Sequence, residues 1–179
     1  MNEAGSALNA RAAIAEDFAR SELFDRTFRE GMDIVEAAAT YLDGPGRQES
    51  KLLSRNAALA YASESMRLTT RLMQVASWLL VQRAVREGDM SSMDACDDRY
   101  RIGPKPGARG NGSLQPPTEA RAGEPLPNGL TELMERSERL YDRISHLDRR
   151  MYVEGEADAR PNAVLSQFER LRAAFDGPL

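Results

Sequence analysis

A row of polar and aromatic side chains recurs at steps of three and four residues in the middle of the chain: Arg67, Arg71, Gln74 and Trp78. Such spacing places all four on one face of a helix. Because Trp and Arg are the residue types most enriched at interaction hot spots, the row is a candidate protein-docking surface. Two arginines one helical turn apart can also clamp a dicarboxylate or a phosphate, which would instead make the row a small-molecule site.

The same row has a purely structural interpretation. Its arginines could stay solvated or pair with acids of the preceding helix such as Asp33 and Glu36, and its tryptophan could close the end of a bundle. Dimeric all-α enzymes of the chorismate mutase type place Arg and Gln or Glu inside a bundle, but their chemistry needs several convergent polar groups in a closed pocket. An enzyme that binds an anionic substrate through Arg67 and Arg71 therefore stands behind docking and pairing as the alternative.

The remaining reactive residue types do not form a catalytic set. His146 is the only histidine, which excludes a His-based metal cluster within one chain. Cys96 lies among aspartates, and we expect this acidic setting to raise its thiol pKa and weaken it as a nucleophile. The acidic stretch 94–98 lacks the Gly and the distal Glu of a calcium loop, and no phosphate-binding glycine motif follows a strand. We expect no catalytic residue, no metal and no cofactor.

Composition favours a helical protein and argues against several classes of partner. Aromatic residues make up only 6% of the 179 residues, which favours helices over sheets. The net charge of −4 argues against a nucleic-acid partner. Apolar runs such as 78–81 are far too short to span a membrane, and no signal peptide is evident. A single cysteine allows no intramolecular disulfide. We therefore expect a cytoplasmic protein with no membrane partner.

Periodicity predicts three long helices. The first covers about 21–42, with Ser21 as its N-cap and Gly44 as a left-handed residue after its end. The second runs from about 48 to 87 without Pro or Gly and forms the spine of the molecule. The third covers about 128–152. Together they predict a three-helix bundle domain over 21–152, preceded by a flexible N-terminal arm over 1–20.

The spine helix carries two apolar stripes on roughly opposite sides. One stripe has a seven-residue repeat: Leu52, Leu59, Met66, Met73 and Leu80. The other contains Ala57, Tyr61, Leu68, Leu72, Val75 and Leu79. A helix on the surface of a single bundle needs only one apolar stripe. The first stripe is therefore a candidate packing face for a bundle or a dimer, and the sequence does not say which stripe contacts a second subunit.

Two further segments lie outside the predicted bundle helices. Gly and Pro dominate the stretch 103–127, which we interpret as a flexible linker. The tail, 153–179, contains a short amphipathic helix whose apolar face carries Leu165, Phe168, Leu171 and Phe175. A helix of about 14 residues is marginal on its own. The tail is therefore a candidate partner-binding segment.

Several of these segments resemble one known family. The stretch "YLDGPGR" (41–47), together with "AYASESMRLTTRLMQVASWLL" (60–80), is similar to the RcdA family of alphaproteobacterial proteins, named for the regulation of CtrA degradation. The third predicted helix, "LTELMERSERLYDRISHLDRR" (130–150), and the tail sequence "AVLSQFERL" (163–171) resemble the same pattern. The resemblance covers most of the three long helices.

The resemblance implies a three-helix bundle that forms a homodimer and has no catalytic activity of its own. It implies an adaptor that binds cell-cycle regulators and helps to deliver them to the AAA+ protease ClpXP, together with response-regulator-like partner adaptors. Recruitment to a cell pole with the protease is a further expectation. The family offers no active-site motif to transfer to this sequence. The residues themselves, with two apolar stripes and no catalytic set, also favour an adaptor.

Overall fold

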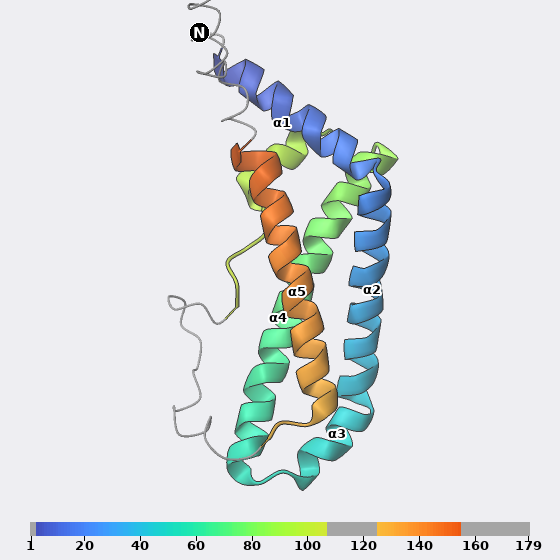
Figure 1. Cartoon of the computed structure of the whole chain (residues 1–179), viewed down its shortest axis with the longest axis vertical. Helices are drawn as coiled ribbons and strands as arrows, with labels where there is room; N and C mark the ends of the chain where they lie inside the picture. The colour runs from blue at the N-terminus through green and yellow to red at the C-terminus, as the bar shows by residue number, and fades with distance from the viewer. Residues whose placement is uncertain (1–2, 107–124, 155–179) are drawn as a thin grey trace, which may run out of the picture.

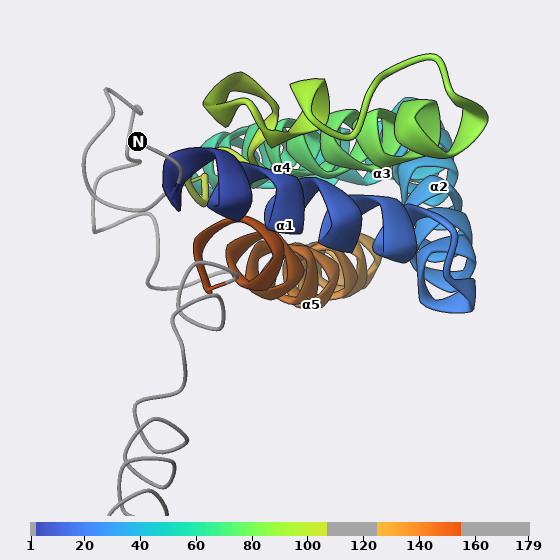
Figure 2. The ribbon, with the colours of Figure 1, turned by 90° about the horizontal axis from the view of Figure 1, so that it is seen from above.

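The computed structural model describes residues 3–106 and 125–154, and its regular structure over these ranges is helical. The helices are α1 Glu3–Ala19, α2 Glu22–Asp43, α3 Pro45–Glu49, α4 Arg55–Glu87 and α5 Asn128–Arg149. The 3-10 turns are η1 Ser50–Leu52, η2 Asp94–Cys96 and η3 Asp98–Tyr100, and a π-helical turn, Arg150–Glu154, follows α5. Helices α2, α4 and α5 run side by side, and α1 crosses one end of them (Figures 1 and 2). The predicted all-α bundle with one long helix is confirmed.

Short local signals set where the long helices begin and end. The side chain of Ser21 accepts a hydrogen bond from the Phe24 N–H at the start of α2, as predicted for an N-cap. Ser54 caps α4 in the same way through the Ala57 N–H. At the end of α4, Gly88 has φ 81, a left-handed conformation that glycine adopts without steric cost.

The region before α4 differs from the predicted continuous helix over 48–87. The chain forms α3 and η1 and is extended at Leu53 and Ser54, where ψ reaches 150 and 164, before α4 begins. The prediction failed because it relied on the absence of Pro and Gly, while a serine cap can also start a new helix. Gly44 is not left-handed either; it has φ −106 and ψ −107. Pro45 occupies the first position of α3, so Gly44 both ends α2 and precedes a second helix.

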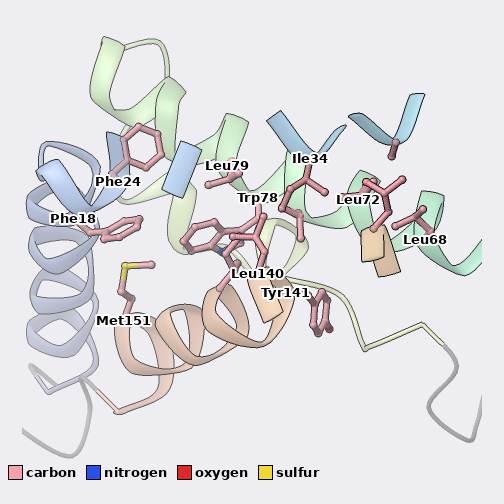
Figure 3. Packing of buried hydrophobic residues seen from close by; sticks show 14 of the residues in the cluster. Phe18, Phe24, Ile34, Leu68, Leu72, Trp78, Leu79, Leu140, Tyr141 and Met151 are labelled. Atoms are coloured by element: carbon pink, nitrogen blue, oxygen red, sulfur yellow. The ribbon is translucent and has the colours of Figure 1, made fainter. Parts of the chain in front are cut away.

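The core lies where the three long helices face one another. Trp78 and Leu79 of α4, Ile34 of α2 and Leu140 of α5 are each at most 1% exposed (Figure 3). Gly31 of α2 allows a close approach between α2 and α4, because a Cβ at this position would lie 2.5 Å from Leu79 Cδ1. The second predicted stripe of the spine, including Leu68 and Val75, faces this core. A close helix–helix seam of this kind is what makes the bundle one packed unit.

Helix α1 differs from the predicted flexible arm. Residues Ala12, Ala15, Phe18 and Ala19 are at most 8% exposed and lie at helical spacing on one face of α1. The Phe18 ring lies 5.7 Å from the Trp78 ring between centroids, and 5.8 Å from Phe24 in an edge-on arrangement. Small alanines on the rest of this face let α1 pack closely across the end of the bundle. The alanine-rich sequence concealed this face, because alanine adds little to an apolar pattern.

Candidate protein-docking surfaces

The predicted row on α4 lies on the side that faces the rest of its own chain. Arg71 is 5% exposed, and its Nη1 donates to the Met134 carbonyl at 3.1 Å and to Ser137 Oγ at 2.9 Å on α5. Trp78 is 1% exposed, and its Nε1 donates to Asp148 Oδ1 at 3.0 Å. Both side chains hold α4 against α5. To serve as docking groups they would have to leave the bundle.

The other two members of the row are half-buried at its edge. Arg67 Nη1 lies 2.7 Å from Glu64 Oε1 on the same helix, and Gln74 Nε2 donates to the Pro104 carbonyl at 3.2 Å. Structural pairing is therefore the role that this structure gives the row. Asp33 and Glu36 of α2, the partners expected for these arginines, are exposed. The arginines bond instead to Glu64 and to α5. The sequence showed the row but not which helix faces it.

The small-molecule hypothesis fails on the same geometry. A dicarboxylate or phosphate clamp requires both guanidinium groups to be open to one ligand. Arg67 is already paired with a carboxylate, and Arg71 points into α5 toward a carbonyl and a hydroxyl. The two arginines therefore do not form a clamp.

Asp148 is a structural residue that the sequence did not reveal. It is 3% exposed. Besides the bond from Trp78, its carboxylate oxygen Oδ2 accepts hydrogen bonds from Arg101 Nε at 2.9 Å and from Arg101 Nη2 at 2.8 Å. The hydrogen bond from Arg101 to this carboxylate raises the pKa of Arg101. The Arg101 guanidinium also lies over the Tyr152 ring, 4.9 Å from its centroid, and burial raises the pKa of Tyr152 to about 12. A buried acid near the end of a charged helix gives no distinctive sequence pattern.

Arg101 begins a short segment that lies along the α4–α5 seam, and we call residues 101–105 the strap. Tyr141 of α5 donates to the Gly103 carbonyl. Lys105 Nζ lies 2.6 Å from Glu138 Oε1 and 3.0 Å from Asp142 Oδ1. The predicted linker over 103–127 therefore starts within a held segment, while 107–124 lies outside the described residues. The strap covers part of the seam that contains the predicted row.

The first predicted stripe of the spine faces outward. Leu59, Met66, Met73 and Leu80, which we call the outer stripe, are 56, 69, 65 and 52% exposed. Leu52 is 87% exposed but belongs to η1, before α4 begins. Single exposed apolar residues are ordinary, but a contiguous apolar row marks an interaction surface. Of the two stripes, this one is available to a partner.

The polar residues within the outer stripe do not oppose such a contact. Thr69 and Thr70 lie between the two methionines, and their hydroxyls donate to the Ser65 and Met66 carbonyls one turn earlier in α4. Their hydrogen-bonding needs are met inside the helix, so both can be covered by a partner without leaving a donor unpaired. The stripe is an apolar, uncharged surface.

The other candidate residues lie outside α4. His146 is exposed on α5. Cys96 is half-buried, and burial rather than its acidic neighbours raises its thiol pKa; Arg11 and Arg101 act in the opposite direction. Among residues 3–106 and 125–154, no cluster of His, Cys, Asp and Glu could hold a metal ion. Within the same ranges, no helix combines the length and apolarity required to cross a bilayer. Leu165, Phe168, Leu171 and Phe175 lie outside the described residues.

Comparison with known proteins identifies the family. A family model described as "Protein of unknown function (DUF1465)" matches residues 15–175. The crystal structure of RcdA from Caulobacter crescentus is 63% identical to this chain, with a TM-score of 0.61. The match covers 78% of this chain and 98% of that one. No curated protein sequence matches significantly. The resemblance noted in the sequence is thus confirmed, and the chain belongs to the RcdA family, whose family model is DUF1465.

Proposed function

We propose that this protein is a non-enzymatic adaptor in regulated proteolysis. It binds cell-cycle regulatory proteins and promotes their delivery to the AAA+ protease ClpXP, together with partner adaptors, and it works as a homodimer. The observation that carries the proposal is the 63% identity to RcdA over 98% of that chain. We place its action in the cytoplasm, with recruitment to a cell pole alongside the protease.

The distribution of side chains on α4 supports a binding role. Arg71 and Trp78 donate hydrogen bonds to α5, and Gln74 donates to the strap. The outer stripe of α4 instead exposes four large apolar side chains. An adaptor needs surfaces of the second kind. The enzyme alternative through Arg67 and Arg71 is not carried forward, because neither guanidinium is open to a ligand.

The tail is proposed as a second contact. Its apolar side chains, Phe168 and Leu171 among them, form a short amphipathic pattern joined to the bundle through a polar stretch. Amphipathic helices commonly bind partners by laying their apolar face into a groove. The tail would thus bind a substrate or a partner adaptor while the bundle supplies the scaffold.

A reconstituted degradation assay tests the proposal. ClpXP, the partner adaptors and a cell-cycle regulator that depends on them are combined with and without this protein. We expect addition of the protein to increase the degradation rate and to leave a directly recognised ClpXP substrate unchanged. An unchanged rate for every adaptor-dependent substrate would reject the adaptor function.

A further inference from the structure

The strap lies in the seam between α4 and α5 as an extended segment and not as part of a helix. Arg101 has φ −67 and ψ 152, values close to those of polyproline II, and residues 102–105 carry no helical turn. The segment runs beside α5 (Figure 1). Ile102 is partly buried and packs against the core, so the strap inserts one apolar side chain into the seam.

Side chains of both helices hold the backbone of the strap. Tyr141 of α5 donates to the Gly103 carbonyl, and Gln74 Nε2 of α4 donates to the Pro104 carbonyl at 3.2 Å. Bonds to main-chain carbonyls depend on an extended backbone and not on one particular side chain. Extended peptides are commonly bound in this way, with main-chain bonds for affinity and side-chain pockets for specificity.

Acidic side chains of α5 receive the two charged ends of the strap. At one end, Arg101 bonds to Asp148, which is 3% exposed. At the other end, Lys105 Nζ lies 2.6 Å from Glu138 Oε1 and 3.0 Å from Asp142 Oδ1. The charge of the seam therefore complements a short basic segment that carries an arginine and, four residues later, a lysine.

The fit between the strap and the seam is incomplete at Pro104. Gln74 Oε1 is buried and accepts no hydrogen bond within the described ranges, 3–106 and 125–154. In an extended segment the N–H and C=O of one residue point to the same side, so a side-chain amide can bond both. Pro104 offers only its carbonyl, because proline has no N–H. A residue other than proline at this place would satisfy both atoms of the Gln74 amide.

From these contacts we infer that the α4–α5 seam binds an extended basic segment of a partner protein, and that the strap is an imperfect occupant of the same site. The partner segment reads arginine, an apolar residue, glycine, any residue except proline, and lysine. Its arginine replaces Arg101 at Asp148, and its fourth residue donates an N–H to Gln74 Oε1. Glycine is required at the third place, because a Cβ at Gly103 would lie 2.8 Å from Gln74 Nε2.

The strap can leave the seam while the helices stay packed, because its residues lie outside all of them. It competes with a free peptide at the high effective concentration of a tethered segment. Weakening the strap should therefore raise the affinity of the seam for a peptide. The inference rests on the contacts of the seam and does not depend on the adaptor function, which the degradation assay tests separately.

Peptide binding measured by fluorescence anisotropy tests the site. One labelled peptide has the sequence of residues 98–107, "DRYRIGPKPG", and a second carries the change Pro104→Ala. We expect the second peptide to bind about fivefold more tightly, because it completes the bond to Gln74. A chain with Gly103→Val, whose added side chain displaces the Gln74 amide from the strap, should bind both peptides about tenfold more tightly than the unmodified chain.

A matched variant isolates the proposed bond. Gln74→Met keeps the length of the side chain and removes its acceptor, so the two peptides should then bind equally. The ratio of their affinities within one chain is independent of competition by the strap, which acts on both peptides alike. Equal binding of the two peptides to the unmodified chain, or a ratio that persists in Gln74→Met, would overturn the inference.

Two further measurements address the location of the peptide. A third peptide, with Arg101→Ala, should lose binding, and undiminished binding would place the contact away from Asp148 and overturn the inference. Circular dichroism checks that the Gly103→Val chain is folded; absence of peptide binding to the folded chain would reject the site. If Gly103→Val unfolds, Lys105→Ala loosens the other end of the strap without touching the core, and the same increase in affinity is expected.

Discussion

The inner and outer faces of α4 belong to one helix and carry similar large side chains, yet their surroundings are opposite. On the inner face, Leu68, Val75 and Trp78 are at most 1% exposed, and even Arg71 is buried, with its Nη1 donating to α5. On the outer face, Met66 and Met73 are exposed by about two thirds. The difference teaches that the inner face stabilises the subunit, whereas the outer face is left for association. Changes on the two faces should therefore affect different measurements.

The largest effect is expected at Trp78. Trp78→Ala should lower the free energy of unfolding by about 3–5 kcal/mol, because it opens a cavity in the core and removes the indole donor from buried Asp148. Urea denaturation followed by circular dichroism measures this change. The matched outer-face control, Leu80→Ala, should change the unfolding of the monomer at high dilution by less than about 0.5 kcal/mol. Equal losses at the two positions would break the distinction between the faces.

A charge on the outer face should act on association instead. Met66→Glu should weaken the homodimer of the proposed function about 100-fold, because it would bury an unpaired carboxylate in an apolar contact. Sedimentation over a concentration series measures the dissociation constant. The matched control, Ala39→Glu on the exposed side of α2, should leave the dissociation constant unchanged. An unchanged dissociation constant for Met66→Glu would place the dimer contact outside the outer stripe.

A moderate effect is expected where the strap meets the inner face. Asp148→Asn should lower the free energy of unfolding by about 2 kcal/mol, because the Arg101 guanidinium loses its ionic acceptor while the Trp78 hydrogen bond can persist. Hydrogen exchange should show faster opening around 101–105. A matched change at the half-buried Lys105, Lys105→Ala, should cost less than about 1 kcal/mol, since ion pairs at the protein surface contribute little. The reverse order would contradict the placement of Asp148.

The smallest effect on stability is expected in the tail. Phe168→Ala combined with Leu171→Ala should leave the melting temperature nearly unchanged and weaken partner binding, because the tail is proposed to bind outside its own bundle. Thermal unfolding and pull-down of a partner adaptor measure the two quantities. A large fall in melting temperature would instead make the segment part of the core.

The sequence predicted the secondary structure better than the pairing of surfaces. The helix α2, its Ser21 cap and the two stripes of α4 followed from residue types and helical spacing, which depend on local geometry alone. The break before α4 was missed because Ser54 is a common residue type, although serine is a preferred cap. The packed face of α1 was missed because it consists largely of alanines. A cap of a common residue type or a face of alanines is hard to recognise in a sequence before the element that packs against it is known.

The candidate site shows the same limit more clearly. The row from Arg67 to Trp78 was visible as a pattern, and the hypothesis of structural pairing was open. Only Arg67 finds its partner on α4 itself; the other three residues bond to α5 or the strap. Those partners lie 63 to 70 residues away in the sequence for Arg71 and Trp78. No local periodicity carries such information, because it depends on how the helices are rotated about their axes when they pack.

The sequence by itself determined that this chain is helical, that it belongs to the RcdA family, and that α4 has two apolar faces. These properties follow from residue order along one helix or from similarity between sequences. Only the tertiary structure decided which face is buried, that Arg71 and Trp78 point inward, and that the outer stripe is exposed. The physical reason is that burial is a property of facing surfaces, and long-range packing alone brings those surfaces together.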